Sequence, residues 1–132
     1  MLDPVSWLHE SALRRHWQWL LVALMGVVSW LAFAPQPAEP HSLTHVDKLE
    51  HAAAFATLTA VALLASRPGL RISLQVALGM LGYGAFIELV QTFLPTRQGD
   101  WPDLLADAVG IAIGLTLVRW ARLRWPASTP SS

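Results

Sequence analysis

The sequence lacks cysteine and contains few charged residues. None of the 132 residues is Cys, which excludes disulfide bonds and thiolate chemistry within the chain. Asp, Glu, Lys and Arg make up 14% of the residues, whereas an ordinary soluble domain has about 25%. The few basic residues form no polybasic tract, so the composition indicates no nucleic-acid partner. The length is that of a single domain.

Long apolar runs occupy most of the chain. Hydrophobic residues make up 54% of it, and there are seven Trp but only one Tyr. Trp accumulates at membrane–water interfaces, and a transmembrane helix needs about 20 mainly apolar residues. The sequence therefore predicts an all-α polytopic membrane protein, a four-transmembrane-helix bundle. The expected spans are residues 17–34, 47–66 (apolar from residue 52), 72–94 and 103 to about 118.

The two ends of the chain differ from the spans. Residues 1–16 predict a short N-terminal amphipathic helix, with Asp3 as the N-cap and Pro4 at the first helical position. Residues 17–124 form the predicted four-helix membrane domain. Residues 125–132 predict a disordered C-terminal tail.

Basic residues are unevenly distributed between the two sides of the predicted bundle. Most of them lie before the first span, between the second and third spans, or after the fourth. These are Arg14, Arg15, Arg67, Arg71, Arg119, Arg122 and Arg124. The other two connections, with their flanking turns, hold only Lys48 and Arg97. Because short cytoplasmic loops are enriched in Lys and Arg, this bias predicts that both termini are cytoplasmic.

Carboxylates show the opposite bias. All except Asp3 and Glu10 lie at the outer ends of the spans or in the outer loops, and within each helix they are spaced to share a face with another polar residue. The aligned pairs are Asp47 with His51, Glu88 with Gln91, and Asp103 with Asp107. We therefore expect one outward-facing polar site inside the bundle. Its members are Asp47, Lys48, His51, Glu88, Gln91, Arg97, Asp100, Asp103 and Asp107.

Glu88 is the deepest of these carboxylates in its predicted span. A carboxylate at such a depth must be ion-paired, hydrogen-bonded or protonated. One interpretation is a salt bridge to Lys48 or Arg97 that fixes the helices. The other is a proton acceptor or a group that binds a lipid headgroup. Gln91 is expected to form a hydrogen bond across helices.

His51 follows Asp47 by one helical turn. This spacing predicts an imidazole oriented by a carboxylate, suited to general-base chemistry or to metal binding, or else a plain interfacial hydrogen bond. Lys48 and Arg97 either neutralise the neighbouring carboxylates or bind a phosphate headgroup.

No cofactor is predicted, since no spacing in the sequence matches a dedicated metal-binding loop. Four carboxylates could nevertheless form an oxygen-rich site for Mg²⁺ or Ca²⁺. They are Glu88, Asp100, Asp103 and Asp107.

Three motifs occur together in residues 47–114. They read Asp47-Lys48-x-x-His51-x-x-x-Phe55-x-x-Leu58, Glu88-x-x-Gln91-x-Phe93-x-Pro95-x-Arg97 and Asp100-Trp101-x-Asp103, followed by Gly110 and Gly114. This combination resembles the VanZ-like membrane proteins. One departure is that the family usually has Asn where this chain has Asp107, which adds a potential negative charge.

The resemblance implies a bacterial protein of the cytoplasmic (inner) membrane with a role in the cell envelope. The family's namesake is linked to resistance to the glycopeptide antibiotic teicoplanin. The implied partners are the lipid bilayer and a lipid-linked envelope precursor. The pattern favours a non-enzymatic protein that binds such a headgroup. The alternative is an intramembrane enzyme in which His51, Glu88 and Asp103 act as acid–base groups, although no nucleophile stands out.

Overall fold

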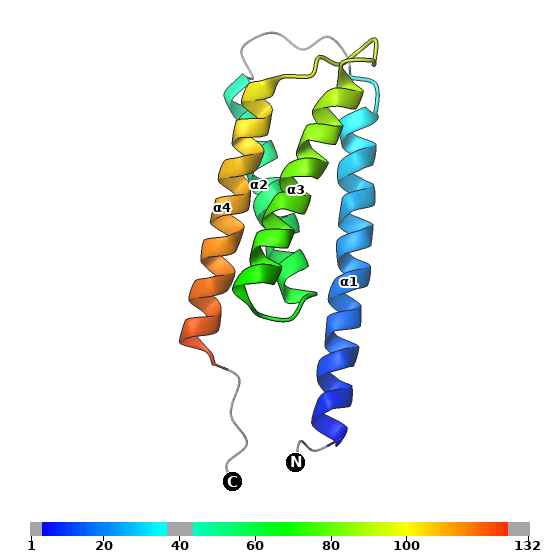
Figure 1. The fold of residues 1–132 in the computed structure, drawn as a ribbon. Coiled ribbons are helices and arrows are strands. Elements are labelled where there is room, and N and C mark those ends of the chain that lie inside the picture. The colour runs from blue at the N-terminus through cyan, green and yellow to red at the C-terminus, as the bar shows by residue number, and fades with distance from the viewer. Residues whose placement is uncertain (1–3, 37–43, 127–132) are drawn as a thin grey trace.

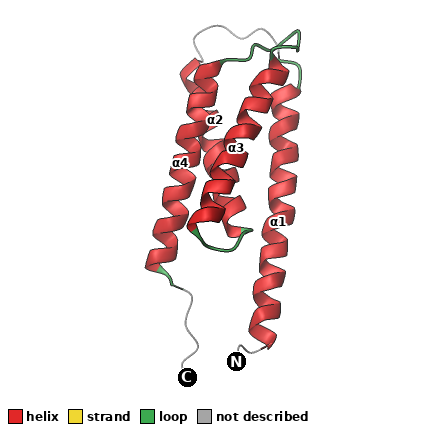
Figure 2. Ribbon diagram, in the orientation of Figure 1, coloured by secondary structure: helices red, strands yellow, loops and turns green. Residues whose placement is uncertain are grey.

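The structure, a computed structural model, describes residues 4–36 and 44–126, with side chains for residues 10–36 and 45–126. Its four helices are α1 (Pro4–Phe33), α2 (Thr44–Leu64), α3 (Leu70–Gln91) and α4 (Trp101–Arg124). They lie side by side, with the start of α1 and the end of α4 at the same end of the bundle (Figure 1). The rest of the described chain is loop and turn, without a strand (Figure 2). The all-α prediction is confirmed.

Helix α1 is continuous from Pro4 to Phe33. The sequence predicted a separate amphipathic helix over residues 1–16, but the structure has no break after His16. No Pro or Gly lies between Pro4 and Gly26, so nothing in this stretch interrupts the helical hydrogen bonds. The first described segment is thus part of the first long helix.

Two other predicted boundaries also differ from the observed ones. Helix α3 ends at Gln91 rather than Leu94, because Pro95 disfavours a helical conformation at the residue before it. Helix α4 continues past Val118 to Arg124, since Arg is a good helix former and Pro126 is the first breaker. Of the predicted tail, residues 127–132 lie outside the described residues.

Three of the helices are long and apolar enough to cross a membrane. Their apolar segments are Glu10–Phe33, Leu70–Gln91 and Trp101–Arg124. Helix α2 is not among these three, because its first two turns contain Asp47, Lys48, Glu50 and His51. This shorter helix contacts each of the other three. The buried core is centred on it through Phe55, Leu58 and Ala62.

Apolar side chains dominate the outside of the bundle, and several polar ones are buried. Trp30 is 75% exposed and Leu78 is 69% exposed. The buried polar residues are Thr59, Glu88, Gln91, Asp103 and Asp107. Lipid tails can solvate exposed Leu and Trp but cannot satisfy a carboxylate, so this distribution is the one expected for a bundle in a bilayer.

Glycines bring the α4 backbone into direct contact with α2. A Cβ atom at Gly110 would overlap the carbonyl oxygen of Ala52, and one at Gly114 would lie 2.7 Å from that of Ala56. Small residues four apart on both helices therefore face each other, as in other closely packed membrane helices. This contact is the most extensive between any two of the described helices.

We expect Gly110→Ala to destabilise the bundle and Gly82→Ala to leave it intact. The new Cβ of Gly110→Ala would meet backbone atoms of Ala52, which cannot rotate away, so the helices must separate at a cost of about 1–3 kcal/mol. At Gly82 no other heavy atom lies within 4 Å of the added carbon, and Ala favours a helix over Gly by up to about 1 kcal/mol. Thermal unfolding in detergent, followed by circular dichroism, compares the two. A midpoint for Gly110→Ala equal to that of Gly82→Ala would contradict the contact.

Candidate functional site

The predicted polar residues gather at the end of the bundle where α2 and α4 begin and α1 and α3 end (Figure 1). On α3 the aligned pair Glu88 and Gln91 is buried, as expected from the sequence, and Gly84 completes a buried stripe on the same face. On α4 the stripe of Asp103, Asp107, Gly110 and Gly114 is buried as well. On α2 the stripe is only partly inside, because Asp47 is exposed and His51 is half-buried.

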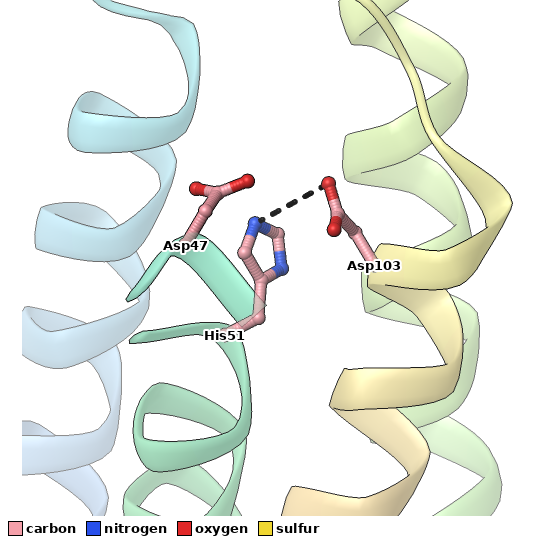
Figure 3. A group of neighbouring side chains, drawn as sticks. All are labelled: Asp47, His51 and Asp103. Atoms are coloured by element: carbon pink, nitrogen blue, oxygen red, sulfur yellow. Dashed lines mark ion pairs between the residues drawn. The ribbon is translucent and has the colours of Figure 1, made fainter. Parts of the chain in front are cut away.

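His51 is held by a carboxylate of another helix. Its Nδ1 lies 2.9 Å from Oδ1 of Asp107, which is fully buried, and its Nε2 lies 4.0 Å from Oδ2 of Asp103. Asp47 was predicted to orient this imidazole along α2. The structure assigns that role to Asp107, because the two side chains face each other across the α2–α4 contact. Asp47 remains nearby, on the outer side of the ring (Figure 3).

Lys48 forms an ion pair with α4. Its Nζ lies 2.9 Å from Oδ1 of Asp103 and 3.6 Å from Oδ2 of Asp100. Of the two interpretations from the sequence, the geometry supports neutralisation of neighbouring carboxylates.

Glu88 makes neither of the predicted salt bridges. Its Oε2 accepts a hydrogen bond from the backbone N–H of Asp100 at 2.7 Å, so a loop rather than a cation contacts it. Gly99 makes this approach possible, because a Cβ there would overlap the carbonyl oxygen of Glu88. The other carboxylate oxygen, Oε1, is buried without a hydrogen-bond partner.

A second buried carboxylate oxygen also lacks a partner. This is Oδ2 of Asp107, which points toward α3 at a position where that helix has Gly84. A Cβ at Gly84 would lie 2.6 Å from this oxygen. Glu88 and Asp107 thus each use one oxygen for a hydrogen bond and keep the other free inside the bundle. Buried oxygens without partners are rare in native structures, and each calls for a ligand or a proton.

Arg97 and Gln91 bind the end of α1 rather than the carboxylates. The Arg97 guanidinium donates to the carbonyl oxygens of Leu31 and Ala34, the latter at 3.1 and 3.2 Å. Gln91 donates from Nε2 to the carbonyl of Ala32 at 3.0 Å, which is the predicted cross-helix hydrogen bond. The last carbonyls of a helix lack internal partners and carry partial negative charge, so a cation suits them. Partial burial lowers the pKa of Arg97, opposed by the charge of Asp47.

The oxygen-rich metal site that the sequence left possible would need Asp100 and Asp103 together with Glu88 and Asp107. Asp100 and Asp103 both contact Lys48, at 3.6 Å and 2.9 Å. Two other groups bring donor atoms within 4.8 Å of one another. One comprises Asp47, His51 and Asp103, and the other comprises His51, Glu88 and Asp107. Each contains the imidazole, which the oxygen-only prediction left out.

The VanZ/LLP1 family model matches residues 2–122. The chain belongs to the VanZ/LLP1 family. This match confirms the resemblance inferred from the motifs, and the apolar helices agree with a membrane protein. No curated protein and no solved structure matches the chain significantly. The family description names no reaction or ligand.

Three polar contacts of this VanZ/LLP1 protein were not predicted. Tyr83 donates to the carbonyl of Met25 at 2.9 Å and pairs with the hydroxyl of Ser29 at 2.7 Å, which joins α3 to α1. Arg122 donates to the carbonyl of Leu63 at 2.8 Å, near the end of α2. As the only Tyr of the chain, within an apolar run, Tyr83 offered a recognisable signal. Arg122 could not be distinguished from the other terminal arginines.

The opposite end of the bundle has a basic character. An open cavity of about 490 Å³ lies there between α1 and the α2–α3 connection. Its lining includes Arg14, Arg15 and Arg67, together with Gln18. The two ends of the protein are therefore chemically distinct, one rich in carboxylates and the other in guanidinium groups.

We expect Arg97→Lys to loosen the end of α1. A lysine ammonium cannot reproduce the forked set of bonds to the Leu31 and Ala34 carbonyls, and the loss is about 1 kcal/mol. Hydrogen–deuterium exchange should speed up in peptides that cover residues 28–36. Arg119→Lys, on the exposed face of α4, is the matched control and should leave that exchange unchanged. Equal exchange in both variants would argue against the contact.

Proposed function

We propose that this protein is a multi-pass protein of the bacterial cytoplasmic membrane with both termini in the cytoplasm. The arginines at one end of the bundle support this orientation, since Lys and Arg are enriched in short cytoplasmic loops. The described ones at that end include Arg14, Arg67 and Arg122. In this orientation the carboxylate-rich end faces the outer leaflet.

We further propose that the polar site binds the headgroup of a lipid-linked envelope precursor. The observation that carries this proposal is the pair of buried, unpartnered oxygens on Glu88 and Asp107, in a site that three helices build. A ligand that donates hydrogen bonds would satisfy these oxygens. Sequestration of such a precursor offers one route to the glycopeptide tolerance linked to the family's namesake.

The contacts of the two cations decide which headgroup chemistry fits. Lys48 is engaged with Asp103 and Asp100, and Arg97 with the carbonyls of α1. Neither guanidinium nor ammonium is thus free to neutralise a bare phosphate. Hydroxyl or ammonium groups of a sugar or amino-sugar headgroup fit the surplus of carboxylate acceptors better.

An intramembrane enzyme is the second candidate, and one observation favours it. The 2.9 Å contact between His51 Nδ1 and Asp107 Oδ1 leaves the other ring nitrogen available as an acid or base. The hydroxyls of Thr57 and Thr92 offer little help, because both donate to carbonyls of their own helix segments. A hydrolytic reaction here would therefore use water as the nucleophile.

The absence of cysteine allows a direct test of the topology. Single-cysteine variants Gln98→Cys and Pro68→Cys place one thiol in each exposed loop on a cysteine-free background. We expect a membrane-impermeant maleimide to label Gln98→Cys in intact cells, or in spheroplasts if an outer membrane is present, and Pro68→Cys only after permeabilisation. Labelling of Pro68→Cys from outside would invert the orientation.

Lipid mass spectrometry of the purified protein tests the headgroup site. We expect wild type to retain an envelope lipid that Glu88→Gln loses by about tenfold or more, because removal of one acceptor leaves the ligand donor unpaired. Glu50→Gln, the same change at an exposed position of α2, is the matched control and should retain the lipid. Equal retention by Glu88→Gln and wild type would contradict the site. A converted lipid that appears only with wild type and Glu50→Gln would favour the enzyme.

A further inference from the structure

The deepest part of the polar site is a group of three side chains from three helices. His51 of α2, Glu88 of α3 and Asp107 of α4 each place one donor atom within 4.8 Å of the donor atoms of the other two. Glu88 is 8% exposed and Asp107 is fully buried. Each carries one buried oxygen without a hydrogen-bond partner. The geometry thus presents three convergent ligand atoms, two of them on buried side chains.

The charges of this end leave the group short of cations. The described side chains that face one another there include five carboxylates and two potential cations. The carboxylates are Asp47, Glu88, Asp100, Asp103 and Asp107, and the potential cations are Lys48 and His51. Lys48 contacts Asp103 and Asp100, and Arg97 binds the carbonyls of α1. Buried carboxylates with one unsatisfied oxygen are costly, so a proton or a cation is needed to compensate Glu88 and Asp107.

We propose that His51, Glu88 and Asp107 bind a divalent transition-metal ion, with Zn²⁺ as the best fit. One imidazole nitrogen and two carboxylate oxygens form a mixed set that Zn²⁺ accepts, whereas Mg²⁺ and Ca²⁺ prefer oxygen alone. Three protein ligands leave a fourth position for water or a substrate oxygen, as in catalytic rather than structural zinc sites. The ion would join α2, α3 and α4 at one point.

The inner group fits a metal better than the outer group of Asp47, His51 and Asp103. In the outer group Asp103 is already paired with Lys48 at 2.9 Å, and Asp47 is exposed. Both unpartnered carboxylate oxygens belong to the inner group. Gly84 supports the same assignment, because any side chain there would occupy the space beside Asp107 Oδ2.

The test measures zinc on the full-length protein in detergent, purified without a polyhistidine tag. Wild type is loaded with Zn²⁺ and freed of excess ion, and its zinc content is measured by inductively coupled plasma mass spectrometry. We expect about one equivalent of zinc per chain. Glu88→Gln and Asp107→Asn should bind at least about 100-fold more weakly. Glu50→Gln and His45→Ala alter exposed side chains of α2 and should bind as wild type does.

A second measurement separates metal loss from misfolding. Added Zn²⁺ should raise the thermal midpoint of wild type and of both controls, while Glu88→Gln and Asp107→Asn, once shown to be helical and monodisperse, should show no shift. Wild type without bound zinc would overturn the inference and leave protonation as the way in which the two carboxylates are compensated. Loss of zinc in Asp47→Asn with retention in Glu88→Gln would also overturn the inference, because it would locate the ion in the outer group.

The metal inference and the headgroup proposal can fail independently. Zinc is measured on delipidated protein, and lipid retention is measured on protein purified without delipidation. Zinc binding together with no retained lipid in wild type would support the metal site and contradict the headgroup proposal. A retained lipid on wild type that binds no zinc would support the headgroup proposal and contradict the metal site.

Discussion

The direct backbone contact between α2 and α4 sets the positions of the polar groups. The two helices run in the same direction, and Gly110 and Gly114 lie against Ala52 and Ala56. One turn before Gly110, Asp107 meets His51, and one turn further, Asp103 meets Lys48. With larger residues at the two glycines the helices would stand further apart, and neither polar contact could form at its present length.

Much of the fold could be predicted from the sequence because a bilayer restricts the choices. Apolar run length indicates the helices, and spacing of three or four residues indicates which polar side chains share a face. The buried stripes of α3 and α4 followed from that spacing. The break after residue 16 was not found, because amphipathic and apolar segments can form one helix when no Pro or Gly separates them.

The pairing within the site could not be predicted in the same way. His51 has Asp47 one turn away on its own helix, but the orienting carboxylate belongs to Asp107, because local spacing carries no information on the distance between helices. Glu88 similarly binds a backbone N–H of the loop that follows α3. That contact depends on the path of Gly99 over the end of α3, which periodicity does not describe.

Helix electrostatics explains part of the charge segregation that also indicates topology. The N-terminal ends of α2 and α4 favour nearby carboxylates such as Asp103, and Arg97 and Arg122 contact carbonyls near the ends of α1 and α2. Because these contacts depend only on the helix ends, the same residues would be favoured there in either membrane orientation. Arg71 is different, since it lies in the first turn of α3, where a helix dipole disfavours cations. The position of Arg71, with those of Arg14 and Arg15 ahead of the uncharged part of α1, therefore supports the proposed orientation in a way that helix electrostatics does not explain.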